Sequence, residues 1–127
     1  AETTLNYTAL SHVNNLAPTA ELRPLNKKQE DETDLMPYKV LVEIERWAIQ
    51  HKYPPTMIYE KLKPKYGTDI KSWIKKFFRL WSINQWKRER LAPSFHMDAF
   101  NVDPRTWCRF PILSSGFKEE LDELDKI

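Results

Sequence analysis

An amphipathic stretch with an aromatic face, residues 68–86, constrains the fold of this chain more than any other feature. At about 100° per residue, its large apolar side chains fall within one broad arc of a helix, and four basic side chains fall on the opposite side. The apolar set is Ile70, Trp73, Ile74, Phe77, Phe78, Leu80 and Trp81, and the basic set is Lys71, Lys75, Lys76 and Arg79. Thr68 and Asp69 follow Gly67 where a cap and a first-turn acid belong. The stretch therefore predicts a central amphipathic helix.

The N-terminal third is expected to contain one helix and one long loop. A helix is predicted over residues 2–14, where four apolar residues recur at helical spacing: Leu5, Ala9, Leu10 and Val13. Residues 16–35 combine Pro18 and Pro24 with charges and few large apolar side chains. This composition predicts a mobile, lid-like loop.

Residues 36–92 are expected to form the helical core. Pro37 opens a helix that runs to about His51, with an apolar face of Val40, Leu41, Ile44, Trp47 and Ala48. Pro54 and Pro55 end it and start the next helix, which Pro64 and Gly67 end. The side chains of that helix that are expected to face inward are Met57, Ile58 and Leu62. The central helix follows, and Pro93 requires Ala92 to leave helical geometry.

Residues 93–127 predict an irregular, extended segment that wraps the helices, followed by a short acidic helix at Lys118–Lys126 with Leu121 and Leu124 on its apolar side. No stretch alternates cleanly enough to predict a sheet. The chain by itself is therefore predicted to be one all-α domain of four to five helices, with a long N-terminal loop and an extended segment before the terminal helix.

Composition excludes several classes of site. With only two glycines, Gly67 and Gly116, the chain cannot form a glycine-rich loop whose amides close around a phosphate. The single cysteine, Cys108, excludes an internal disulfide framework and a cysteine-rich metal site, and favours an intracellular setting. No apolar run reaches membrane-spanning length and no signal peptide is visible, so a soluble, cytoplasmic protein without a membrane partner is expected.

The remaining reactive residues do not form a recognisable catalytic or metal site. The three histidines, His12, His51 and His96, lie in separate predicted elements and are interpreted as surface or packing residues. Cys108 is interpreted as an inert thiol. The acidic run at residues 30–34 is interpreted as a solvated face.

The basic residues leave two functional interpretations open. Residues 68–98 carry seven cations against three acids, although the whole chain has a net charge of only +2. Lys71, Lys75, Lys76 and Arg79 fit an ordinary solvated helix face. Trp86, Lys87 and Arg88 instead place an aromatic ring beside cations outside the apolar arc. This pattern suits either a phosphate-bearing small ligand or, as the alternative, single-stranded nucleic acid. A structural subdomain that contributes to subunit assembly is a third possibility.

Four segments in order resemble the carboxyl end of NAD synthetases, and a fifth, later segment resembles the glutamine-dependent branch of that family. They are residues 17–24 (APTAELRP), 29–38 (QEDETDLMPY), 77–78 (FF), 84–88 (NQWKR) and 107–111 (WCRFP). The resemblance implies that the chain is the C-terminal segment of the synthetase domain, an α/β adenine nucleotide α-hydrolase-like domain. It also implies that the pyrophosphate-binding loop and a nitrilase-like glutaminase domain lie elsewhere in the same polypeptide. The segment alone is then expected to be inactive.

The resemblance further implies a reaction and its site residues. An ATP pyrophosphatase domain, using ATP and Mg²⁺, adenylates nicotinic acid adenine dinucleotide (deamido-NAD), and glutamine-derived ammonia displaces AMP to give NAD. Thr19 is expected to contact ATP, while Lys87, with Trp86 and Arg88, is expected to contact deamido-NAD; no residue is assigned to catalysis or metal. Asp31 and Glu32 fall in a loop that closes over the active site in relatives. A homo-oligomer is expected, with no nucleic acid partner.

Overall fold

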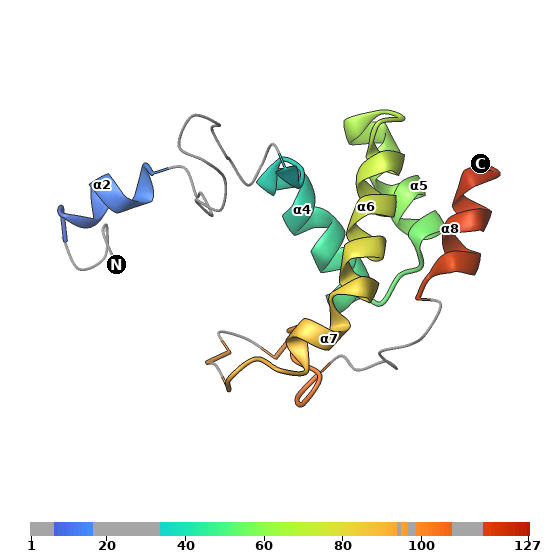
Figure 1. Cartoon of the computed structure of the whole chain (residues 1–127). Coiled ribbons are helices and arrows are strands. Elements are labelled where there is room, and N and C mark those ends of the chain that lie inside the picture. The colour runs from blue at the N-terminus through green and yellow to red at the C-terminus, as the bar shows by residue number, and fades with distance from the viewer. Residues whose placement is uncertain (1–6, 17–33, 94, 97–98, 108–115) are drawn as a thin grey trace, which may run out of the picture. The chain divides into compact units, whose positions relative to one another are not determined.

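The computed structural model describes residues 7–16, 34–93, 95–96, 99–107 and 116–127. By its internal contacts the chain divides into two units, Ala1–Pro37 and Tyr38–Ile127. Every regular element in the described residues is a helix, which confirms the all-α prediction for that part of the chain (Figure 1). None of the helices within the described ranges is both long enough and apolar enough to cross a membrane.

The first unit includes a short helix, α2, at Leu10–Asn14. It is shorter than the predicted helix over 2–14, of which residues 2–6 lie outside the described residues. The apolar spacing does not lead to burial in the described part, because α2 buries no residue and Val13 is 58% exposed. Most of the predicted lid-like loop, residues 17–33, also lies outside the described residues.

The second unit is a packed group of helices. Its first helix begins as α4 at Tyr38–Glu45 and continues as a π-helix, η1, at Arg46–Gln50. This confirms the predicted helix from Pro37 to about His51, except that the π-turn was not expected. The His51 amide donates to the carbonyl of Arg46, five residues earlier, at 3.2 Å. Of the predicted face, Val40, Ile44 and Ala48 are buried.

The next helix, α5, spans Pro55–Tyr66. Pro55 is at its start as expected, but Pro64 does not end it, because a proline in the last turn interrupts only the final hydrogen bonds. Gly67, with φ of 71°, is the C-cap. The prediction that Met57 faces inward is wrong, since it is 41% exposed. The buried stripe has the spacing i, i+3, i+4, i+7 and comprises Pro55, Ile58, Tyr59 and Leu62.

The central helix, α6, spans Ile70–Ile83 and confirms the predicted apolar arc. Ile70, Ile74 and Phe78 are at most 2% exposed. The predicted cap is wrong in detail, because Asp69 is the N-cap in helical geometry and makes no capping bond with its side chain. Instead, its carbonyl oxygen accepts from the Ser72 hydroxyl at 2.8 Å. The helix also stops earlier than Pro93, since Asn84 separates it from a four-residue helix, α7, at Gln85–Arg88.

The terminal helix, α8, spans Lys118–Asp125 and agrees with the prediction. Its Leu124 is fully buried. α6 contacts α4 and α5, and α5 contacts α8, so the four helices lie in the order α4, α6, α5, α8 (Figure 1). Phe117, the N-cap of α8, closes the core with its ring centroid 4.7 Å from that of Phe78 and 5.3 Å from that of Trp81.

Candidate functional site

The short helix α7 is separated from α6 by Asn84, whose backbone groups form hydrogen bonds with both helices. The Asn84 amide donates to the carbonyl of Leu80 at 3.1 Å, which closes α6. The Asn84 carbonyl then accepts from the amides of Lys87 and Arg88, which opens α7. Gln85 is fully buried, whereas the indole of Trp86 is 44% exposed and Lys87 is exposed. The break therefore produces a short helix with one buried side and one open side.

The buried side of α7 is a hydrogen-bond network, called here the Arg88 network. One guanidinium nitrogen of Arg88 donates to the carbonyl of Trp81 in α6 and, at 2.9 Å, to Oε1 of Gln85. The amide nitrogen of Gln85 donates to Oε1 of Glu89 at 3.0 Å. Because the carbonyls of the last helical turn lack partners within the helix, Arg88 also caps the C-terminus of α6.

The open side of α7 carries what we call the Trp86 surface, formed by Trp86, Lys87 and Arg90. Nζ of Lys87 lies 5.8 Å from the centroid of the indole ring, and Cζ of Arg90 lies 5.3 Å from it. Two cations thus lie close to one exposed aromatic ring. Such a surface can stack on a planar ring and bind a nearby phosphate.

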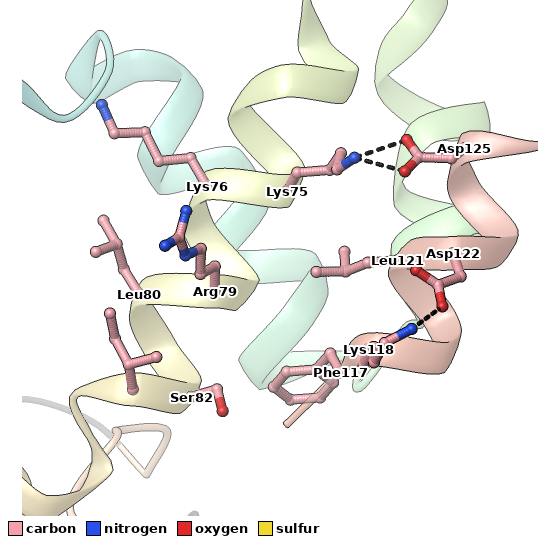
Figure 2. Close-up of a pocket in the computed structure, with 11 residues that line it drawn as sticks. Lys75, Lys76, Arg79, Leu80, Ser82, Phe117, Lys118, Leu121, Asp122 and Asp125 are labelled. Atoms are coloured by element: carbon pink, nitrogen blue, oxygen red, sulfur yellow. Dashed lines mark hydrogen bonds and ion pairs between the residues drawn. The ribbon is translucent and has the colours of Figure 1, made fainter. Parts of the chain in front are cut away.

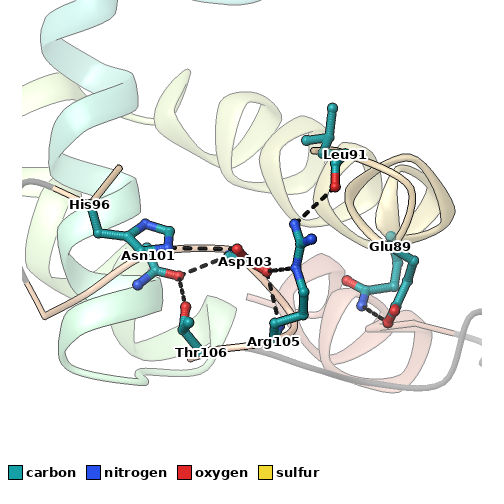
Figure 3. Close-up of polar contacts among 8 residues, drawn as sticks. Glu89, Leu91, His96, Asn101, Asp103, Arg105 and Thr106 are labelled. Atoms are coloured by element: carbon teal, nitrogen blue, oxygen red, sulfur yellow. Dashed lines mark hydrogen bonds and ion pairs between the residues drawn. The ribbon is translucent and has the colours of Figure 1, made fainter. Parts of the chain in front are cut away.

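A polar turn at residues 101–106, called the Asp103 turn, is hydrogen-bonded to the chain just after α7 (Figure 3). Oδ1 of Asp103 accepts from the backbone amide and from Nε of Arg105, at 2.9 and 3.0 Å. The other end of the Arg105 guanidinium donates to the carbonyl of Leu91 at 3.0 Å. Nε2 of His96 lies 3.5 Å from Oδ2 of Asp103. These contacts tie the chain after Pro93 to the residues just beyond α7.

The bonds to Asp103 also set its protonation. The backbone amide of Arg105, then its guanidinium, holds the pKa of the Asp103 carboxyl below its usual value. Asp103 is therefore charged at neutral pH and keeps both bonds to Arg105. Asn101 completes the turn, since its side-chain oxygen accepts from the Asp103 amide and the Thr106 hydroxyl, each at 2.9 Å.

The predicted site residues fall in different environments. Trp86 and Lys87 lie together on the exposed side of α7, whereas Arg88 is half-buried and its guanidinium is bonded inside the protein. Thr19, Asp31 and Glu32 lie outside the described residues, as does Cys108. The sequence reasoning missed Gln85, because a glutamine in a polar tail is ordinarily exposed; its spacing of three residues from Arg88 was the available signal.

The basic face of α6 borders an open groove of about 740 Å³ between α6 and α8 (Figure 2). Two ion pairs lie along it. Nζ of Lys75 lies 2.6 Å from a carboxylate oxygen of Asp125, and Lys118 pairs with Asp122 within α8. The predicted solvated face is therefore partly engaged by acids of the terminal helix. In the part of the chain that the structure describes, no three His, Cys, Asp or Glu side chains come together to hold a metal ion.

Comparison with known proteins identifies the class to which this helical segment belongs. No family model matches the chain. It is 30% identical over 136 residues to the glutamine-dependent NAD(+) synthetase of Arabidopsis thaliana and 29% identical over 142 residues to that of Drosophila melanogaster. Both alignments cover 100% of this chain, but only 19% and 18% of the relatives.

A solved structure supports the same class at higher identity. The crystal structure of a glutamine-dependent NAD(+) synthetase from Cytophaga hutchinsonii matches 98% of this chain with 52% sequence identity and a TM-score of 0.75, over 19% of its own length. The chain therefore belongs to the glutamine-dependent NAD(+) synthetase family. It spans about a fifth of the length of the relatives that it matches.

Proposed function

We propose that this chain is the C-terminal segment of the synthetase domain of a glutamine-dependent NAD synthetase and supplies part of its deamido-NAD site. The observation that carries the proposal is the Trp86 surface, an exposed indole with two cations close to its ring, in a chain with 52% identity to a solved synthetase. The complete enzyme adenylates deamido-NAD with ATP, and glutamine-derived ammonia displaces AMP to give NAD.

The Trp86 surface fits an anionic dinucleotide. Deamido-NAD carries a pyrophosphate, a nicotinate carboxylate and two planar rings. Its adenylation brings that carboxylate next to a triphosphate, and cations must offset the repulsion before the attacking geometry is reached. In this proposal Lys87 supplies one such cation, and the indole of Trp86 stacks on one ring of the dinucleotide. Lys87 and Arg90 both lie close to this ring, so both cations would be near a stacked ligand.

Other parts of the proposal concern residues and segments beyond the described ones. Thr19 is assigned to ATP, since a hydroxyl can donate to a phosphate or ribose oxygen without adding charge. Mg²⁺ accompanies ATP in the complete enzyme. Because the described residues contain no cluster of three metal-ligating side chains, we assign no metal ligand among them and derive no step through the ion. The same proposal includes the surrounding α/β domain, a cytoplasmic homo-oligomer and a glutaminase domain in the same polypeptide.

Lys87→Ala in the complete polypeptide tests the deamido-NAD assignment. Loss of a charged hydrogen bond worth about 1.5–3 kcal/mol should lower kcat/KM for deamido-NAD by about ten- to hundredfold. Glutaminase activity should stay intact. Lys126→Ala is the matched control, since Lys126 is also an exposed lysine but follows α8. Unchanged deamido-NAD kinetics for Lys87→Ala would count against the proposal.

Two further measurements separate the parts of the proposal. Thr19→Ala should raise the ATP concentration needed for half-maximal rate, and an unaltered ATP dependence would refute that assignment. The 127-residue chain alone should form no NAD from deamido-NAD, ATP and ammonia. NAD formation by the chain alone would contradict its assignment as a segment.

The same surface would also accommodate a base of single-stranded nucleic acid. Titration of the chain with an oligonucleotide distinguishes this alternative. Salt-dependent binding that quenches Trp86 fluorescence, together with normal deamido-NAD kinetics in Lys87→Ala, would favour a nucleic acid module instead.

A further inference from the structure

Gln85 is the one polar side chain that is buried in the part of the chain the structure describes, with 0% exposed. Burying an amide without hydrogen bonds is costly, so such a group is retained where its partners satisfy it. Here Oε1 accepts from Arg88 and the amide nitrogen donates to Glu89. Both partners lie on α7 or directly after it, so these bonds satisfy the buried amide, and the burial of Gln85 keeps this side of the helix turned inward.

Arg88 fixes the same helix against α6. Its guanidinium bonds both the Trp81 carbonyl, in the last turn of α6, and the Gln85 side chain. Both bonds come from one terminal nitrogen, which the rigid guanidinium plane holds one bond farther along the side chain than the ammonium of a lysine would lie. The Arg88 network thus joins the end of one helix to the start of the next across the break at Asn84.

Helical geometry relates this network to the Trp86 surface. At about 100° per residue, positions 85, 88 and 89 fall within one arc of about 100°, and positions 86, 87 and 90 fall on the opposite arc. Fixing the first arc to α6 consequently fixes the direction of the second. The cations that flank the indole lie on this second arc.

We propose that Arg88 and Gln85 are positioning residues, which hold Lys87 and Trp86 in the orientation that binds deamido-NAD, and that Arg88 does not itself touch the substrate. The proposal rests on the function proposed above. It replaces the expectation from the sequence that Arg88 binds deamido-NAD directly. The guanidinium donates to groups inside the protein, and this observation favours a positioning role for Arg88 over direct contact with the substrate.

Arg88→Lys and Gln85→Leu in the complete polypeptide test the proposal. Arg88→Lys keeps the positive charge but removes the terminal guanidinium nitrogen that makes both bonds, and Gln85→Leu removes the acceptor with little change in volume. Misplacing a binding group by about 1 Å can lower activity about a hundredfold. We expect each variant to raise KM for deamido-NAD by about tenfold or more, with the KM for glutamine unchanged. The double variant should be no worse than either single variant. Arg79→Lys, on the exposed face of α6, is the matched control.

Hydrogen exchange in the 127-residue chain gives a readout that does not depend on activity. The amide of Glu89 donates to the Gln85 carbonyl at 3.0 Å, and the amide of Arg90 donates to the Lys87 carbonyl at 3.1 Å. Both amides should exchange faster in Arg88→Lys and Gln85→Leu than in Arg79→Lys. Unchanged exchange would overturn the proposal.

The kinetic outcomes distinguish positioning from direct contact. A raised KM in Arg88→Lys with a normal KM in Gln85→Leu would mean that Arg88 touches the substrate, and normal KM values in both variants would equally overturn the proposal. If Lys87→Ala leaves deamido-NAD kinetics unchanged, the function proposed for the surface fails instead. The structural part is then decided by exchange alone: faster exchange of Glu89 and Arg90 supports it, and unchanged exchange overturns it.

Discussion

Gly116 lies where the chain enters α8, and its replacement by alanine should be strongly destabilising. Its φ of 65° is in the left-handed region, which costs an L-residue about 1–2 kcal/mol. An added Cβ would lie 2.1 Å from Oγ and 2.7 Å from Cβ of Ser82 in α6. A new hydroxyl rotamer could remove the first overlap, but the second needs backbone movement. Overpacking of this kind costs about 1–3 kcal/mol.

The two costs together predict a loss of about 2–5 kcal/mol for Gly116→Ala, a large part of the 5–15 kcal/mol typical of a folded domain. Urea unfolding of the chain, followed by circular dichroism, measures this loss. A double-mutant cycle with Ser82→Gly separates the two terms, because it removes the overlap and leaves the backbone cost. In that background Gly116→Ala should cost about 1–2 kcal/mol. A loss below about 0.5 kcal/mol in the parent, or the same loss in both backgrounds, would refute the reasoning.

Two further outcomes follow from the core and from the Asp103 turn. Phe78→Ala should lower the free energy of unfolding by about 3–5 kcal/mol, measured by urea titration, because the ring is 2% exposed and packs against Phe117; a loss below about 1 kcal/mol would contradict its place in the core. The folded-state pKa of Asp103 is lowered, so the stability that its carboxylate contributes is present above about pH 4 and is lost as the pH falls through the folded-state pKa. Weaker protection of the Arg105 amide below about pH 4, relative to its exchange in an unfolded peptide at the same pH, should report this loss; Asp103→Asn should remove this pH dependence of the protection, and its persistence in that variant would assign it to another group.

The helices of the second unit were largely predictable from sequence because amphipathic spacing and prolines mark them. The apolar arc of α6, the start of α5 at Pro55 and the terminal helix were all confirmed. The incorrect predictions concern burial and a helix end, both of which are decided by tertiary contacts. Tyr59 is buried and Met57 is exposed, since the position of a residue on the helix face decides its burial more than its hydrophobicity does. The break at Asn84 has no proline or glycine to signal it.

The candidate site was predictable in part for a similar reason. Trp86 and Lys87 were recognised because an aromatic residue and cations stand outside the apolar arc. The inward direction of Arg88 was not predictable, because it depends on a buried glutamine and on a carbonyl freed by the end of α6. The attachment of the Asp103 turn to the chain after α7 depends on a hydrogen bond between Arg105 and Leu91, which are fourteen residues apart. Hydrophobic periodicity carries no information on such polar contacts.

The π-turn at Arg46–Gln50 is the place where the first core helix should tolerate the removal of a residue better than elsewhere. A π-turn holds one residue more than the α-turn it replaces, so removing a residue here would restore regular pairing instead of interrupting it. Because the wider π-turn already accommodates the extra residue, the chain downstream would keep nearly its present direction. A deletion from the regular α-turns of α4 would instead rotate the following chain by about 100° and move it by about 1.5 Å. A variant shortened within the π-turn, at a residue other than Trp47, should thus keep both its helix content and the stacking of Trp47 on Tyr53.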